Sequence, residues 1–325
     1  MFYPAAAARS YPFFLVALFV IACGLTFLET AANPYITVLG DEEGATQRLN
    51  FAQSFNGLAA TLAPFLGGIF ILSGNTLSSA EEASMSGGQL DAYLNAEAAA
   101  VQVPYLLIGG VVLLVALLLY FTRLPDIAEV DRGTEATRPL LREKNLLLGV
   151  LAQFFYIGAQ VCVSSFFIRF SQQVAGIGEK AAAQYLAAAL LGFMAGRFIG
   201  TFLMRYIPAP RLLAVYSLLN FFLVLLAVIL PGTFSVYALM GVEFFMSIMF
   251  PTIFSLSIRG LGGKTKEGSS LVIMAIVGAQ SSRSSWVGCR TGAAFRRPIW
   301  CLLPGGLLLC PQNMRVKHIQ LVTAH

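Results

Sequence analysis

Long apolar stretches separated by short polar ones are the main feature of the sequence. A run of about 20 apolar residues is long enough to cross the hydrocarbon core of a bilayer as a helix. The runs do not alternate between apolar and polar residues, as the strands of a membrane barrel would. We therefore predict an all-α, polytopic membrane bundle. Seven full spans are expected, at 13–33, 48–72, 104–122, 145–168, 181–204, 211–230 and 234–256.

The loops between these spans indicate how the chain is organised. An eighth apolar stretch begins near Gly268 and stops after about 11 residues, which is too short to cross a bilayer. Most basic loop residues fall in alternate loops, which places those loops in the cytoplasm and the start of the chain outside. A start outside with no signal peptide suggests that upstream helices are missing. We expect an N-terminal helical remnant (1–122), a cytoplasmic linker (123–144), an incomplete C-terminal half (145–278) and an aberrant tail (279–325).

Composition supports the membrane assignment and separates the tail from the rest. Of the 325 residues, 57% are hydrophobic and 11% are charged, whereas soluble domains carry about 25% charged residues. Residues 1–278 hold 15 Lys and Arg against 16 acids, while 279–325 hold six basic residues and no acid, so the net charge of +5 belongs to the tail. The tail also holds both tryptophans and three of the five cysteines, which fits translation in a wrong reading frame.

No motif for nucleotide binding, zinc binding or serine hydrolysis occurs in the sequence. The cysteines suggest neither a disulfide framework nor a metal site. We therefore expect no enzyme activity, no cofactor, no metal and no nucleic-acid partner.

Three ionisable residues lie inside predicted spans, where such groups usually face a cavity or a partner. Glu29 precedes Asn33 by one helical turn, and we expect its desolvated carboxyl group to exchange a proton. A structural carboxylate paired with another helix fits the same pattern. For Arg197 and Glu243 we expect gating or structural roles, with Glu243 as a possible second protonatable group. Pro251 is expected to bend the helix that carries Glu243 and to help it line a cavity.

Amide side chains cluster in the second predicted span. Asn50, Gln53 and Asn56 follow one another at intervals of three residues and therefore share one helix surface. Amides suit a neutral polyol because they bond hydroxyl groups without burying charge. Tyr156 and Gln160 are one turn apart in a later span and are further candidates for ligand contact. Hydrogen bonding between helices is the alternative for the three amides. Packing of an aromatic ring against small residues is the alternative for Tyr156 and Gln160.

Several long segments, in order along residues 1–278, resemble the fucose:proton symporter family of the major facilitator superfamily. Segments of this length in a fixed order are far more specific than a short pattern. They are FLETAANPYITVLG (27–40), RLNFAQSFNGL (48–58), QFFYIGAQ (153–160), GRFIGT (196–201), MSIMFPTIFSLSIRGLG (246–262) and KEGSSLVIM (266–274).

The resemblance implies a twelve-helix fold, of which this chain holds about seven full helices, with two halves rocking about a central sugar site. It implies proton-coupled sugar uptake across the bacterial inner membrane, with Glu29 in proton and sugar coupling and Gln53 and Asn56 as sugar ligands. The family's first-helix aspartate is absent from this sequence. We expect a monomer in the lipid bilayer whose partners are protons and a monosaccharide of the L-fucose or glucose/galactose type. A non-transporting remnant and another major facilitator substrate class are the alternatives.

Overall fold

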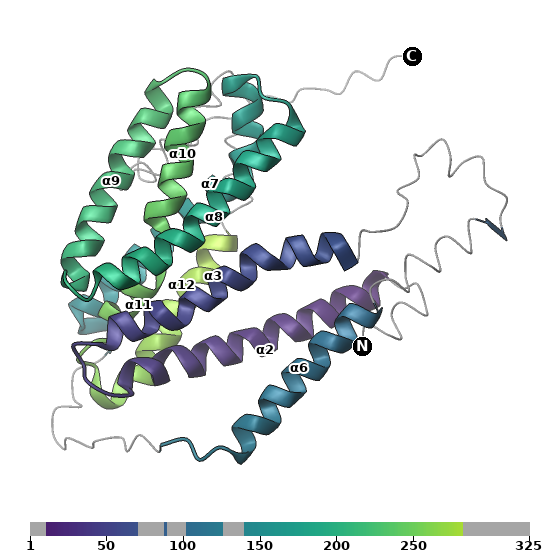
Figure 1. Cartoon of the computed structure of the whole chain (residues 1–325). Helices are drawn as coiled ribbons and strands as arrows, with labels where there is room; N and C mark the ends of the chain where they lie inside the picture. The colour runs from purple at the N-terminus through teal and green to yellow at the C-terminus, as the bar shows by residue number, and fades with distance from the viewer. Residues whose placement is uncertain (1–10, 71–87, 90–101, 126–139, 282–325) are drawn as a thin grey trace, which may run out of the picture.

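A computed structural model describes residues 11–70, 88–89, 102–125 and 140–281, and all regular secondary structure in these ranges is helical (Figure 1). The predicted all-helical architecture is therefore confirmed. The helices are α2 (Tyr11–Val38), α3 (Ala45–Phe70), α6 (Gln102–Phe121), α7 (Lys144–Ala175), α8 (Glu179–Leu203), α9 (Ala209–Ile229), α10 (Thr233–Met246), α11 (Met249–Ile258) and α12 (Thr265–Ser281), with short 3-10 turns at Leu140–Arg142 and Gly262–Lys264.

Six stretches of the described chain are long and apolar enough to cross a membrane: α2, α6, α7, α8, α9 and the combined stretch Thr233–Ile258. The sequence predicts seven. The difference is α3, which has 26 residues but whose first half is polar, with Arg48, Asn50 and Gln53. Helix α12 begins at Thr265, three residues before the predicted start. Apart from its first three residues, the predicted aberrant tail lies outside the described residues.

Helices α7 to α12 pack into one bundle. Helix α10 packs against α9, α8 and α7, and α7 also packs against α11 and α12. Two glycines of α8, one turn apart, allow the close approach of α8 to the junction of α10 and α11. A Cβ atom at Gly196 would lie 2.6 Å from the carbonyl oxygen of Phe244, and one at Gly200 would press on Ile248. Small residues at this spacing let membrane helices approach closely without a hydrophobic driving force.

The N-terminal helices lie against this bundle. Helix α3 packs on α8 and α11, and α2 packs on α3 and α12 (Figure 1). A small apolar cluster joins the two parts of the chain, because Leu49 of α3 packs with Leu146 of α7 and Phe254 of α11. Helix α6 has no buried side chain in the described structure, as suits an apolar helix in lipid.

The turn between α2 and α3 and the turn between α11 and α12 lie at one end of the bundle, on the lower left of Figure 1. Glu42, in the turn between α2 and α3, forms an ion pair with Arg259 at the end of α11. Leu140, before α7, and Leu261, after α11, pack on the same apolar cluster. The positive-inside rule predicts that this end faces the cytoplasm.

Candidate functional site

Three amide side chains form a hydrogen-bonded chain between α2 and α3. Gln53 lies at its centre: its Nε2 donates to Asn33 Oδ1 at 2.9 Å, and its Oε1 accepts from Asn56 Nδ2 at 3.1 Å. Asn33 and Gln53 are buried, whereas Asn56 is exposed, so the chain runs from the interior to the surface. Glu29 is half-buried one helical turn before Asn33, and both therefore lie on the same side of α2.

A second group of polar contacts forms the seam between α3 and α11. Thr46 Oγ1 lies 2.9 Å from Ser255 Oγ, and Asn50 Nδ2 donates to Thr252 Oγ1 at 3.1 Å. All four side chains are buried. Asn50 also donates to the Thr46 carbonyl at 2.9 Å, while its Oδ1 atom has no partner among the described residues. In this structure Asn50 therefore bonds between helices.

Arg197 joins α8 to both sides of this seam. Its side chain is 5% exposed. Its Nε donates to the carbonyl of Ser247 at 2.7 Å, and its Nη1 donates to the carbonyl of Gln53 at 2.9 Å. Its Cζ lies 4.6 Å from the ring centre of Phe193 on the same helix. Two carbonyl dipoles and an aromatic face therefore stabilise the buried cation.

The position of Pro251 explains why one of these carbonyls is available. In an α-helix the N–H of residue 251 would donate to the carbonyl of residue 247, and a proline has no N–H to donate. The helix is interrupted between Met246, where α10 ends, and Met249, where α11 begins. Arg197 supplies the hydrogen bond to the Ser247 carbonyl that Pro251 cannot supply.

A polar row on α7 faces α10. Tyr156 is buried and its hydroxyl donates to the carbonyl of Met246 at 3.0 Å. Ser164, two turns further along α7, donates to Glu243 Oε1 at 2.7 Å. Gln160 lies between them at the same helical spacing and is half-buried, with no hydrogen bond within the described part of the chain.

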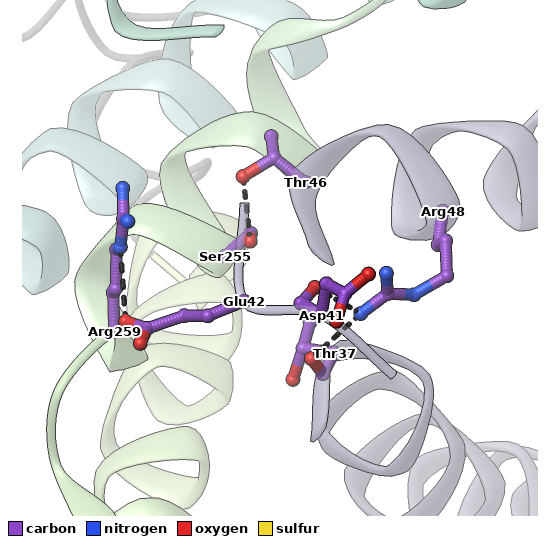
Figure 2. A network of polar contacts seen from close by, with 7 residues as sticks. All are labelled: Thr37, Asp41, Glu42, Thr46, Arg48, Ser255 and Arg259. Carbon is purple, nitrogen blue, oxygen red and sulfur yellow. Dashed lines mark hydrogen bonds and ion pairs between the residues drawn. The ribbon is translucent and has the colours of Figure 1, made fainter. Parts of the chain in front are cut away.

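At the end of the bundle that the positive-inside rule predicts to be cytoplasmic, two arginines hold the turn between α2 and α3 (Figure 2). Arg48 Nη2 donates to the carbonyl of Asp41 at 2.8 Å and to that of Thr37 at 3.4 Å. Arg259 Nε lies 3.0 Å from Glu42 Oε1. The Arg259 and Glu42 side chains are 49% and 67% exposed, so this ion pair stabilises the contact only weakly.

The sequence analysis did not single out several buried polar residues of the site. Gln153 of α7 is fully buried, and neither atom of its amide has a partner among the described residues. An amide inside an apolar run is a signal that was present in the sequence. Small hydroxyl side chains carry no such signal, because they occur throughout membrane helices. The contacts missed for that reason involve Thr46, Ser164, Thr252 and Ser255.

The described residues contain no group of three or more His, Cys, Asp or Glu side chains placed to hold a metal ion.

Comparison with known protein families identifies the fold. The family model described as Major Facilitator Superfamily matches residues 1–283. The chain belongs to the Major Facilitator Superfamily. A match of this extent agrees with the apolar helices of the described chain, and the protein is a multi-pass protein of the bacterial inner membrane.

Individual relatives extend this assignment. The chain is 38% identical over 311 residues to a glucose/galactose transporter of Brucella abortus, covering 93% of this chain and 72% of that protein. It is 41% identical over 288 residues to the L-fucose-proton symporter of Escherichia coli, covering 86% of this chain and 66% of the symporter. These relatives are named as transporters, not as enzymes.

A solved structure is similar over the same extent. It is a crystal structure of a Major Facilitator Superfamily transporter in the outward conformation, with a TM-score of 0.84 and 39% identity, and the match covers 93% of this chain and 76% of that one. A variant of the Escherichia coli fucose:proton symporter has the same TM-score at 38% identity. The resemblance to this family is therefore confirmed.

Proposed function

We propose that this protein takes part in proton-coupled sugar transport by alternating access, with a monosaccharide of the L-fucose or glucose/galactose type as its substrate. The relatives named as L-fucose-proton symporter and glucose/galactose transporter support the substrate class. The observation that carries the proposal is the chain of amides from Asn33 through Gln53 to Asn56.

The amide chain has the chemistry that a neutral sugar needs. Each hydroxyl of a monosaccharide both donates and accepts a hydrogen bond, and so does each amide. Asn56 is exposed at one end of the chain, and Asn33 Nδ2 at the other end is buried with no partner among the described residues. We assign sugar contact to these two residues and to Gln53. In the C-terminal half, Tyr156 and Gln160 of α7 are further candidates for contact with the sugar. Asn50 is a weaker candidate because it bonds across the seam.

Proton coupling is assigned to Glu29. Its carboxyl group lies one turn from Asn33, which bonds the proposed sugar ligand Gln53. A change in the charge of Glu29 therefore acts on the same helix turn that positions the amides. This placement couples the proton to the sugar site through one turn of α2 and the hydrogen bond between Asn33 and Gln53.

Alternating access requires the contacts between residues 1–122 and 145–278 to break and form again, with 123–144 as the linker. These contacts include three interhelical bonds: Thr46 to Ser255, Asn50 to Thr252, and Arg197 to the Gln53 carbonyl. Polar groups released from such bonds are solvated by water when the seam opens, so separation costs less than it would at an apolar interface. Arg197 and Pro251, at the helix interruption, are assigned to gating.

The test is uptake of radiolabelled L-fucose, D-glucose and D-galactose into membrane vesicles with an imposed proton gradient, alongside calorimetric titration of sugar binding. Gln53→Ala and Asn56→Ala are each expected to weaken sugar binding by about 1 to 3 kcal/mol, because a bound hydroxyl loses its partner. Asn220→Ala is the matched control, since Asn220 is a buried amide that bonds Met249 in the C-terminal bundle. Unchanged sugar affinity in both α3 variants would assign these amides to helix packing.

A further inference from the structure

Glu243 is a buried carboxyl group that the proposed transport cycle does not use. Glu243 lies on α10, one helical turn before the interruption at residues 247–248, and is 1% exposed. Its Oε1 atom accepts a hydrogen bond from Ser164 Oγ of α7 at 2.7 Å. Ser164 is the hydrogen-bond partner of this carboxyl group in the described chain, and it is a neutral one.

The helices packed around α10 carry several titratable groups. The buried ones in the described residues are Tyr156 and Cys162 of α7, Arg197 of α8 and Tyr216 of α9, and α11 contributes none. Tyr156 donates to the Met246 carbonyl. Arg197 is held by the carbonyls of Ser247 and Gln53. Within the described ranges, no basic group lies within ion-pair distance of Glu243.

These surroundings fit a neutral carboxyl group and not a carboxylate. An ionised carboxylate this deeply buried needs a cation or several donors, and a single serine hydroxyl does not replace the water that it loses. A protonated carboxyl group is neutral and needs no cation, because one hydrogen-bond donor satisfies its carbonyl oxygen. Oε1, which accepts from Ser164, is then the carbonyl oxygen, and Oε2 carries the proton.

We propose that Glu243 is a proton-binding site of the C-terminal half and is separate from Glu29. In the conformation described here, Glu243 carries a proton. The proton comes from water, converts the carboxylate to a neutral carboxyl group at Oε2, and returns to water when the site opens. The use of this proton in sugar transport rests on the proposed function, whereas its presence on Glu243 does not.

The location of Glu243 gives the proton a route to conformational change. Ser164 lies on the same side of α7 as Tyr156 and Gln160, which are candidates for sugar contact. The helix interruption lies one turn beyond Glu243, so α10 is able to move against α7 without breaking a regular run of backbone hydrogen bonds. Such a movement separates Glu243 from Ser164 and admits water, and the carboxyl group then releases its proton.

Infrared difference spectroscopy of the purified protein in lipid tests the proton directly. The measurement is made in a Glu29→Gln background, which removes the other carboxyl group proposed to bind a proton. The carbonyl stretch of a protonated carboxyl group, recorded at neutral pH, is expected in this background and absent after the further substitution Glu243→Gln, which keeps the shape and the acceptor for Ser164. Ser164→Ala is expected to move this band to higher frequency without removing it, because the carbonyl oxygen loses its donor. Ser165→Ala, at the neighbouring exposed position, is the matched control and is expected to leave the band in place.

In the Glu29→Gln background, a band that persists after Glu243→Gln, or that is missing while Glu243 is present, overturns the proposal. A second measurement is the pH profile of sugar exchange in vesicles. Glu243→Gln is expected to remove one of two titration steps while exchange continues, and a profile that keeps both steps also overturns it. Absence of any sugar exchange in the unmodified protein refutes the proposed function alone, because the infrared band does not depend on transport.

Discussion

Arg197 donates to the Ser247 carbonyl, which Pro251 leaves without a helical donor. From this contact we predict the size of a coupling between substitutions at positions 197 and 251. Arg197→Ala is compared in two backgrounds, the unmodified chain and Pro251→Ala. Alanine at position 251 restores an N–H that is able to donate to the Ser247 carbonyl within a continuous helix. If Arg197 substitutes for that N–H, the two substitutions are coupled.

The magnitude follows from the two hydrogen bonds of Arg197, at 2.7 and 2.9 Å. A hydrogen bond to a charged donor contributes about 1.5 to 3 kcal/mol, so Arg197→Ala is expected to lower the unfolding free energy by about 3 to 6 kcal/mol. In the Pro251→Ala background the Ser247 carbonyl keeps a partner after Arg197 is removed. The cost of Arg197→Ala should therefore fall by about 1.5 to 3 kcal/mol.

The assay is unfolding by sodium dodecyl sulfate in mixed micelles, followed by helical circular dichroism. Pro34→Ala is the matched control, because Pro34 is also a proline inside a helix but makes no contact with Arg197. In that background Arg197→Ala should cost as much as it does in the unmodified chain. An equal cost of Arg197→Ala in the Pro251→Ala background would refute the substitution of the guanidinium for the missing N–H.

Two further predictions concern proton coupling and helix packing. Glu29→Gln is expected to abolish sugar accumulation driven by a proton gradient while sparing sugar exchange, because the amide keeps the shape of the side chain but releases no proton. Vesicle assays of both activities check this prediction. Unchanged accumulation would contradict the role of Glu29. Gly196→Ala is expected to destabilise the bundle by about 1 to 3 kcal/mol, because its Cβ would lie 2.6 Å from the Phe244 carbonyl oxygen. Gly192→Ala on the same helix, where a Cβ meets nothing within 4 Å, should be tolerated in the same unfolding assay.

The helices could be predicted from the sequence because hydropathy reports their surroundings directly. An apolar run must be helical in lipid, so α7, predicted at 145–168, and α8, predicted at 181–204, begin within two residues of the expected positions. Helix α3 is the exception in membrane character, since amides that serve its contacts also lower its hydropathy. The same residues that obscure α3 as a span mark it as a candidate site.

The contacts between helices could not be predicted in the same way. Asn50 and Thr252 are separated by 202 residues, and nothing in the local pattern around either residue points to the other. Arg197 was expected to serve as a gate or a structural residue, but its partners are backbone carbonyls, which every residue carries and no sequence distinguishes. Pro251 leaves the Ser247 carbonyl without its helical N–H donor. Recognising that Arg197 supplies the missing hydrogen bond requires the packing of α8 against α10 to be known.

The seam between α3 and α11 and the turn beside it contain two kinds of contact. The burial of these contacts decides which one controls the opening of the seam. Glu42→Gln removes an ion pair between exposed side chains, which contributes at most about 1 kcal/mol, so opening should change by less than about fivefold. Thr252→Ala removes one of the two acceptors of the buried Asn50 Nδ2, leaving only the Thr46 carbonyl, while Asn50 Oδ1 has no partner among the described residues. That loss costs about 1 to 3 kcal/mol, which favours opening by about 5- to 150-fold.

A reporter cysteine at the buried position Thr201 measures this opening through its rate of alkylation, in a background where the five native cysteines are replaced. Gln47 of α3 donates to the Thr201 carbonyl at 3.3 Å, so the reporter lies at the contact that separates when the seam opens. The alkylation rate should rise far more in Thr252→Ala than in Glu42→Gln. The reverse order would mean that the exposed ion pair, and not the buried hydrogen bonds, holds the two parts of the chain together at this end.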